Sequence, residues 1–346
     1  MFIDPHVHCR DEEQAYKETI AHALKTAERA GFTAIFDMPN TKRPVDSKAR
    51  VVERLALARE AKSPVFYGMY MALTGDVDQI KEAVATYREF KEVVGFKLYA
   101  GHSVGRIGVI DIEKQRRIYQ TLVHEDYRGV LAIHCEKESM MTGNWNPTKP
   151  ITHALARPPE AEVASVRDQI DFAREYGFQG TLHIAHVSVP EAVKIAKSQH
   201  DVRVTCGVCP HHLLLDYRAM ESLRGLLMKM NPPLRPPGMP EEMLELLRNR
   251  EIDWIETDHA PHTLEERIGV PYLSGITGLQ KYPKFVQWLR DKAFSEERIR
   301  EITFDAISRA FELEVPRREC IPEYGLDKQF DNIYRFDPYD GFGVLE

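Results

Sequence analysis

The sequence MFIDPHVH, residues 1–8, predicts a β-strand, because it is rich in Phe, Ile and Val and polar residues follow it. His6 and His8 are two positions apart in this strand. Side chains at i and i+2 of a strand point to the same face. Two imidazoles on one face can share a metal ion, or they can be ordinary strand histidines. This stretch alone leaves both interpretations open.

Beyond this strand, short apolar runs alternate with amphipathic helical patterns. The runs predict strands at 1–8, 33–38, 65–72, 94–99, 130–135, 181–187, 202–208 and 252–257. Helical patterns lie at 13–30, 47–61, 77–93, 111–127, 159–176, 189–199, 238–249, 277–293 and 296–312. Eight strand–helix units predict an α/β fold, a parallel (β/α)8 TIM barrel. The alternative, an open doubly wound sheet, is typically marked by a Gly-rich phosphate loop after its first strand, and the sequence has none.

Length and composition narrow the function classes. The barrel would occupy residues 1–313 of the 346, and the irregular stretch 314–346 would be a C-terminal tail packed on it. The net charge of −7 argues against nucleic acid or an anionic membrane as partner and leaves a small-molecule substrate. We find no apolar run of about 18 residues and no secretory signal. The five scattered cysteines are typical of a reduced, cytoplasmic protein.

Most potential metal ligands fall where the predicted strands end. The carboxyl-terminal ends of barrel strands converge on one mouth, where active sites of this fold lie. The residues concerned are His6, His8, His134, His183, His186, His211, His212, Asp258 and His262. The barrel therefore predicts a binuclear metal site at its C-terminal face.

Lys97 ends the fourth predicted strand, in the run VGFKLYA at 94–100. An ammonium group is costly to bury among apolar neighbours. The side chain could react with CO₂ to give a carbamate that bridges two metal ions. Alternatively, its ammonium group could reach the barrel mouth and stay solvated.

Two later strands add further candidates. His183 and His186 are three positions apart, so on a strand they face opposite ways, and we expect only His186 to be a ligand. Asp258 follows the last strand, where a carboxylate can bind a metal and accept a proton from metal-bound water. Cys206 and Cys209 superficially resemble a zinc motif, but on a strand they would face opposite sides and could not share a metal.

Four polar residues are candidates for substrate binding: Arg10, Asn40, Asn231 and His262. Arg10 follows His8 by two positions and should point the same way if the strand continues. A guanidinium group there suits a carboxylate, which it can bind through two hydrogen bonds.

Taken together, several runs resemble the dihydroorotases of the amidohydrolase superfamily. They follow one another in family order from residue 4 to about 280. The runs are DPHVHCRD (4–11), DMPNT (37–41), GFKLY (95–99), HCE (134–136), RPPEAE (157–162), HVS (186–188), PHHLLL (210–215), MNPPLR (230–235), DHAPH (258–262) and GITGLQ (275–280).

The resemblance implies a zinc-dependent enzyme that reversibly cyclises N-carbamoyl-L-aspartate to L-dihydroorotate in pyrimidine biosynthesis. It implies that two zinc ions are held by His6, His8, Lys97 as an N6-carboxylated lysine, His134, His186 and Asp258. Asp258 would also be the catalytic residue, and Arg10, Asn40, Asn231 and His262 would bind substrate. A homodimer, or association with aspartate carbamoyltransferase, is compatible with this identification.

The chain also departs from the family pattern, and alternatives stay open. Many relatives carry a β-sandwich built from both termini, for which almost no residues precede His6. Some relatives bridge their metals with an Asp instead of the lysine carbamate. Two other functions compete: another cyclic amidohydrolase, such as a hydantoinase or allantoinase, and a non-catalytic partner of aspartate carbamoyltransferase. A metal-dependent phosphoesterase would need more phosphate-binding cations than Arg10.

Overall fold

The computed structural model describes residues 1–103, 107–222, 224–314, 334 and 336–345. Its centre is a sheet of eight parallel strands paired in chain order, which confirms the predicted TIM barrel. The barrel closes between the last strand and the first, where the amide of His8 donates to the carbonyl of His259 at 2.8 Å. The strands are β1 Phe2–Val7, β2 Phe32–Asp37, β3 Phe66–Ala72, β4 Val93–Tyr99, β5 Val130–His134, β6 Thr181–Ile184, β7 Val204–Val208 and β8 Trp254–Ile255.

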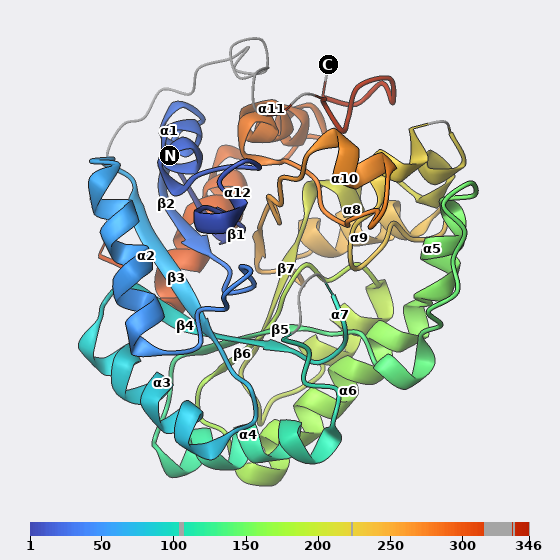
Figure 1. Ribbon diagram of the computed structural model, residues 1–346. Coiled ribbons are helices and arrows are strands. Elements are labelled where there is room, and N and C mark those ends of the chain that lie inside the picture. Colours follow the sequence, from blue (N-terminus) through green and yellow to red (C-terminus); the bar gives the residue numbers. More distant parts are fainter. Residues whose placement is uncertain (104–106, 223, 315–333, 335, 346) are drawn as a thin grey trace.

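Helices surround the strands on the outside of the barrel (Figure 1). Each turns an apolar face toward the sheet; in α1, for example, Ile20, Leu24 and Ala27 are buried. The principal helices are α1 Ile20–Arg29, α2 Lys48–Glu60, α3 Val77–Glu89, α4 Ile112–His124, α6 Pro159–Tyr176, α7 Pro190–Lys197, α9 Met239–Arg248 and α11 Tyr282–Asp291. No helix among the described residues is long and apolar enough to cross a membrane.

Several predicted boundaries differ from the observed ones. The helix predicted at 13–30 begins only at Ile20, because Thr19 is extended and its side chain caps the helix by accepting from the amide of His22. The predicted helix 296–312 consists of α12 Glu296–Arg300, a π-helical turn at Glu301–Asp305 and α13 Ala306–Ala310. Three short helices in loops were not predicted: α5 Ile151–Ala156, α8 Pro210–Leu214 and α10 Leu264–Ile268.

The barrel interior is apolar at one end and polar at the other. At the amino-terminal end of the strands, Phe304 and Ile307 belong to the same buried cluster as Tyr70 and Trp254. The ring of Phe311 lies 5.0 Å from that of Phe36 and helps to close this end. The polar inward-facing side chains therefore lie at the carboxyl-terminal end of the strands, where enzymes of this fold have their active sites.

The described part of the predicted C-terminal tail contacts the barrel. Tyr339 is buried, and Tyr334 donates a hydrogen bond from its hydroxyl to Glu18. Lys281 forms an ion pair with Asp337 at 2.6 Å. The remainder of the predicted tail, at 315–333, 335 and 346, lies outside the described residues.

Candidate active site at the barrel mouth

His6 lies on β1 and His8 follows it, and both side chains approach Asp258, which follows β8, the strand next to β1 in the closed barrel. The Nε2 atoms of the two histidines lie 3.4 Å and 2.9 Å from Oδ1 of Asp258. All three side chains are buried, and their ligand atoms lie within 4.8 Å of one another. The i, i+2 spacing therefore places both imidazoles on one face, as predicted, and beside a carboxylate 250 residues further along the chain.

His134 and His186 complete the cluster. His134 ends β5, and its Nδ1 atom lies 3.2 Å from Nε2 of His186. The ring of His186 is in turn 4.9 Å from the ring of His6. Every imidazole in the predicted ligand set thus belongs to one continuous group.

Lys97 is fully buried near these histidines. Within the described part of the chain, its Nζ atom has no hydrogen-bond partner and lies 5.2 Å from the centre of the Tyr99 ring. Burial lowers the pKa of Lys97 to about 8. A buried amine without a partner is unusual and requires an explanation, such as a bound ion or a modification. The alternative that its ammonium group is solvated at the barrel mouth is wrong, because the residue is 0% exposed.

The orientation of the imidazoles supports metal binding. The outer nitrogen of each of two rings faces an oxygen acceptor: Nε2 of His134 lies 2.8 Å from Glu136, and Nδ1 of His8 lies 2.6 Å from Asn40. Nδ1 of His6 lies 3.3 Å from Glu256 without a hydrogen bond to it among the described residues. A neutral imidazole carries a single proton, so a ring that donates outward turns a lone pair inward. Outer contacts of this kind orient histidine ligands in metal sites. The donors present therefore fit divalent metal ions.

Burial favours the neutral form of three of the imidazoles, those of His6, His134 and His186. It lowers the pKa of His6 to about 4 and also lowers the pKa values of His134 and His186. For Asp258, burial opposes ionisation, but the close contact with His8 and the proximity of His6 hold the pKa below its usual range. The cluster thus combines neutral imidazoles with an ionised carboxylate, the protonation states that ligands of a divalent ion require.

Glu256 is a site residue that the sequence analysis missed. Its carboxylate accepts from the amide of His186 at 2.5 Å and lies 3.0 Å from Nε2 of His183. The expectation that His183 and His186 face opposite ways was wrong, because β6 ends at Ile184 and His186 has a positive φ of 41°. Both residues contact Glu256, at different depths of the barrel. The spacing of Glu256, two positions before Asp258, was the signal that could have revealed it.

Three of the four predicted substrate-binding residues line the same pocket, whereas the fully buried side chain of His262 contacts Arg10 and is not part of the lining. The described lining of the pocket includes Arg10, Asn40 and Asn231 with the clustered histidines and Asp258. Arg10 is buried; its Nε donates to the carbonyl of Pro261 at 3.1 Å, and its Nη2 lies 3.0 Å from Nε2 of His262. A guanidinium group and an imidazole therefore converge beside the candidate metal ligands. This is an arrangement suited to a carboxylate.

A polar network fixes the loop that carries Arg10. Residues 10, 11 and 12 all have positive φ angles, of 48°, 71° and 52°. Residues other than Gly rarely adopt this backbone conformation. The buried guanidinium group of Arg54 donates to the carbonyl of Arg10 and pairs with Asp37, which accepts from the amide of Cys9. Cys9 is thus held through its backbone.

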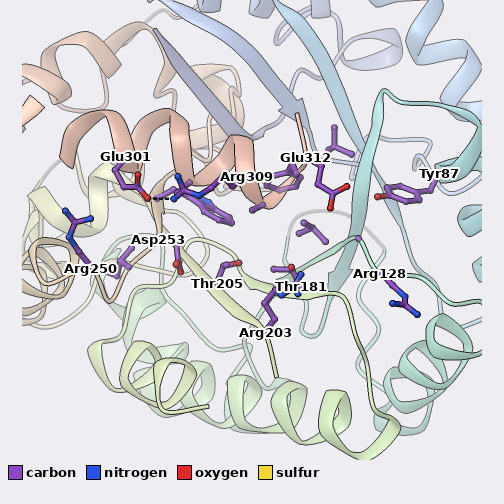
Figure 2. A pocket seen from close by; sticks show the side chains of 18 of the residues that line it. Tyr87, Arg128, Thr181, Arg203, Thr205, Arg250, Asp253, Glu301, Arg309 and Glu312 are labelled. Atoms are coloured by element: carbon purple, nitrogen blue, oxygen red, sulfur yellow. Dashed lines mark hydrogen bonds and ion pairs between the residues drawn. The ribbon is translucent and has the colours of Figure 1, made fainter. Parts of the chain in front are cut away.

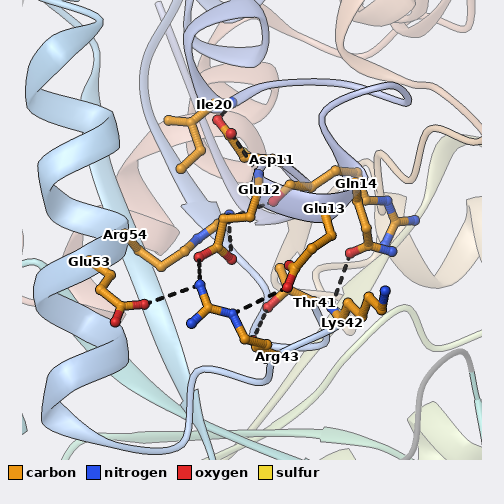
Figure 3. Close-up of polar contacts among 12 residues, drawn as sticks. Asp11, Glu12, Glu13, Gln14, Ile20, Thr41, Lys42, Arg43, Glu53 and Arg54 are labelled. Carbon is orange, nitrogen blue, oxygen red and sulfur yellow. Dashed lines mark hydrogen bonds and ion pairs between the residues drawn. The ribbon is translucent and has the colours of Figure 1, made fainter.

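The same network joins this loop to the one that follows Asn40. Figure 3 shows Glu12 paired with Arg43, and Gln14 accepting from the amide of Lys42. The distances are 2.6 Å and 3.1 Å. The two loops that present Arg10 and Asn40 are therefore held in a fixed relation to each other.

Two other features of the structure are weaker candidates. A cavity of about 680 Å³ at the amino-terminal ends of the strands is lined by arginines, carboxylates and Trp254; no histidine occurs among its described lining (Figure 2). A second buried group comprises Cys209, His211 and His212 but not Cys206. It offers three ligand atoms among the described residues, and a structural zinc site takes four. The cluster around His6 is therefore the candidate active site.

In sequence, the chain is similar to amidohydrolases, and among them to dihydroorotases. The Amidohydrolase family matches residues 2–109. A dihydroorotase of Methanothermobacter thermautotrophicus is 30% identical, over 98% of this chain and 79% of its own length. A dihydroorotase of Halobacterium salinarum is 33% identical, over 90% of this chain and 71% of its own length.

Solved structures share the fold at lower identity. The L-hydantoinase (dihydropyrimidinase) of Arthrobacter aurescens superposes with a TM-score of 0.81 at 21% identity, over 99% of this chain and 81% of its own. The dihydroorotase of Saccharomyces cerevisiae in complex with 5-fluoroorotic acid superposes with a TM-score of 0.73 at 19% identity, over 91% of this chain and 84% of its own. At these identities the structural likeness supports the barrel fold alone.

Proposed function

Because the chain belongs to the dihydroorotase family of the amidohydrolases, and is thus a hydrolase acting on cyclic amides, we propose that it is itself a dihydroorotase. It would interconvert N-carbamoyl-L-aspartate and L-dihydroorotate, as a step of pyrimidine biosynthesis. The observation that carries this choice is the convergence of Arg10 and His262, 3.0 Å apart, beside the histidine cluster. Dihydroorotate bears a carboxylate on its ring, and this pair provides a binding site for it.

We propose two zinc ions as the cofactor, held by six side chains. The support is the inward lone pairs of the oriented imidazoles and the unpartnered Nζ of Lys97, which we propose is N6-carboxylated. The ligands would be His6, His8, Lys97, His134, His186 and Asp258. Zinc ions bound there would lower the pKa of water and polarise a carbonyl group.

The remaining chemistry belongs to the chain. In the hydrolytic direction, Asp258 takes the proton of the attacking water and delivers it to the ring nitrogen as the amide bond breaks. In the cyclising direction, the carbamoyl nitrogen attacks the carboxyl carbon, and Asp258 takes a proton from that nitrogen and returns it to the carboxyl oxygen that leaves as water. The position of Asp258, 2.9 Å from His8, keeps it ionised and ready to accept. Asp258 is thus the proposed catalytic residue.

Substrate orientation falls to residues on the other side of the pocket. Arg10 and Asn40 hold the carboxylate, with His262 assisting. Asn231, whose Oδ1 accepts from Ser274 at 3.3 Å, lies where it can contact the pyrimidine ring. Fixing the ring in this way places the reacting carbonyl next to the water and supplies much of the rate.

A substrate comparison tests the proposal. We expect the zinc-loaded protein to hydrolyse L-dihydroorotate with a kcat/KM at least about a hundredfold above that for hydantoin, allantoin or dihydrouracil, because only dihydroorotate offers a ring carboxylate to Arg10. Absorbance of the ring amide follows each reaction directly. Faster turnover of hydantoin or allantoin would identify a different cyclic amidohydrolase. No turnover of any of the four would favour the non-catalytic alternative.

A further inference from the structure

Lys229 is a buried cation directly behind the candidate substrate pocket. It lies two positions before Asn231 and is 7% exposed. Its Nζ atom donates to Oγ of Ser274 at 2.6 Å and to the carbonyl of Tyr272 at 2.9 Å. The ammonium group also lies 4.9 Å from the centre of the Trp145 ring. Burial of an ammonium group is costly, so a lysine held in this way requires an explanation.

Ser274 connects Lys229 with the pocket. Ser274 and Asn231 both belong to the described lining of the pocket. Oγ of Ser274 donates to Oδ1 of Asn231 at 3.3 Å. A hydroxyl group has one proton to donate and two lone pairs, whereas an ammonium group can only donate. Because Lys229 donates to Ser274, the hydroxyl proton of Ser274 cannot point to Lys229, and it is donated to Asn231.

This chain of hydrogen bonds orients the side-chain amide of Asn231. With Oδ1 bound by Ser274, the NH₂ group of Nδ2 lies on the other side of the amide. Its one hydrogen bond among the described residues runs to Oγ of Ser103, which also lines the pocket. The distance of 3.5 Å is well beyond the usual N–H···O distance of about 2.9 Å. Nδ2 therefore retains the capacity to donate to an oxygen atom in the pocket.

We propose that Lys229 is a positioning residue, which acts through Ser274 to turn the NH₂ group of Asn231 toward the substrate, where it donates to a carbonyl oxygen of the pyrimidine ring. A cyclic amide presents carbonyl oxygens, which accept, and N–H groups, which donate. The orientation of Asn231 thus selects which of these groups it can bind. The inference rests on the proposed function for the identity of the ring, whereas the chain of hydrogen bonds is independent of any substrate.

Backbone contacts hold the two segments together without the Lys229 side chain. The carbonyl of Lys229 accepts from the amide of Gly275 at 2.9 Å and from Nη1 of Arg267 at 2.8 Å. The guanidinium group of Arg267 also donates to the carbonyl of Leu273. Substitution of the Lys229 side chain leaves these acceptors in place. Loss of its ammonium group should therefore change the orientation of Asn231 without detaching the loop.

The orientation of Asn231 can be measured in the ligand-free protein. Neutron diffraction from crystals exchanged into D₂O distinguishes the oxygen of an Asn side chain from its ND₂ group. In the wild type we expect the oxygen to face Ser274, with the hydroxyl deuterium between them. In Lys229→Met the hydroxyl group of Ser274 can either donate or accept, so we expect both orientations. An ND₂ group facing Ser274 in the wild type, or one unchanged orientation in both proteins, would overturn the proposal.

A double-mutant cycle provides the kinetic test. Lys229→Met and Ser274→Ala should each raise KM for dihydroorotate about fivefold, the size of effect expected for one neutral hydrogen bond, and change kcat little. Ser274→Thr keeps the hydroxyl group and should recover most of the affinity. In an Asn231→Ala background, Ser274→Ala should have no further effect, because the amide that it orients is gone. An equal effect of Ser274→Ala in both backgrounds would overturn the proposal.

The kinetic measurements need the ammonium form of Lys229. Burial, together with the nearby guanidinium groups of Arg267 and Arg157, lowers the pKa of Lys229 to about 7. At about pH 6 most of the side chain is protonated. Lys197→Met is the matched control, because Lys197 pairs with Asp253 at the opposite end of the barrel. An equal rise of KM in this control would overturn the specific role of Lys229.

The two proposals fail in different ways. If the wild type does not turn over dihydroorotate, the proposed function fails, and the neutron map still decides the orientation of Asn231. If the wild type is active but Lys229→Met keeps its KM, the positioning role of Lys229 is wrong and the function stands.

Discussion

Replacement of Asp258 with Asn is expected to lower kcat for dihydroorotate by about a thousandfold, within the range of roughly 10² to 10⁴ that a positioned proton acceptor contributes. The amide has nearly the shape of the carboxylate, so the fold should not change. It cannot take a proton from water, and it is a weaker ligand than an ionised carboxylate next to His6 and His8. Initial rates at saturating substrate and zinc measure the effect.

Asp253→Asn is a matched control for this substitution. Asp253 lies just before β8 and pairs with Lys197 at 2.6 Å, at the opposite end of the barrel from the site. Its replacement should cost some stability and leave kcat unchanged. Metal content, measured in the same samples, separates loss of the proton acceptor from loss of an ion. Wild-type kcat in Asp258→Asn would contradict the catalytic role of Asp258.

Replacement of Arg10 with Met is expected to lower kcat/KM for dihydroorotate by about a hundredfold, mainly through KM. Removal of one partner from a buried, hydrogen-bonded charge pair costs about 2–5 kcal/mol. The guanidinium group of Arg10 is oriented by its hydrogen bond to the carbonyl of Pro261. Because Arg10 is only 2% exposed, bulk water cannot take over the contact with the substrate carboxylate in the variant. Steady-state kinetics over a range of substrate concentrations separate the effect on KM from that on kcat.

The substrate itself provides the control for Arg10. Dihydrouracil has the same ring without the carboxylate, and Arg10→Met should process it no worse than the wild type does. An equal loss on both substrates would mean that Arg10 supports the loop rather than the carboxylate. No loss on either would contradict its placement in the binding site.

Strand alternation explains how much of the site the sequence could predict. It placed His6 and His8 on one face, and the barrel brought Asp258 to within 2.9 Å of His8. These groups lie on or just after strands, where direction follows from position. The strand does not continue to Arg10, because β1 ends at Val7, and Arg10 reaches the pocket from a loop in which its own φ is 48°. His183 and His186 were less predictable, because β6 ends between them and the positive φ of His186 turns its side chain back into the barrel.

The residues that support the site were not predicted. Arg54 has nothing unusual in its local sequence and acts through a contact with the carbonyl of Arg10. Glu256 has only its spacing from Asp258 as a signal, and it acts through contacts with His183 and His186, which are about 70 residues away in the chain. Such contacts depend on loop geometry, which a strand and helix pattern does not specify. The fold was more predictable than its details, since eight apolar runs are visible in the sequence, whereas the start of α1 at Ile20 depends on one capping threonine.

Anomalous diffraction at the zinc edge, from crystals grown with zinc, tests the central claim of a two-metal site most directly. The account predicts two peaks at the carboxyl-terminal mouth of the barrel, flanked by His6, His8 and Asp258 and by His134 and His186, with branched density on Lys97 that reaches both. Peaks elsewhere, or none, together with an unbranched Lys97 side chain, would contradict it.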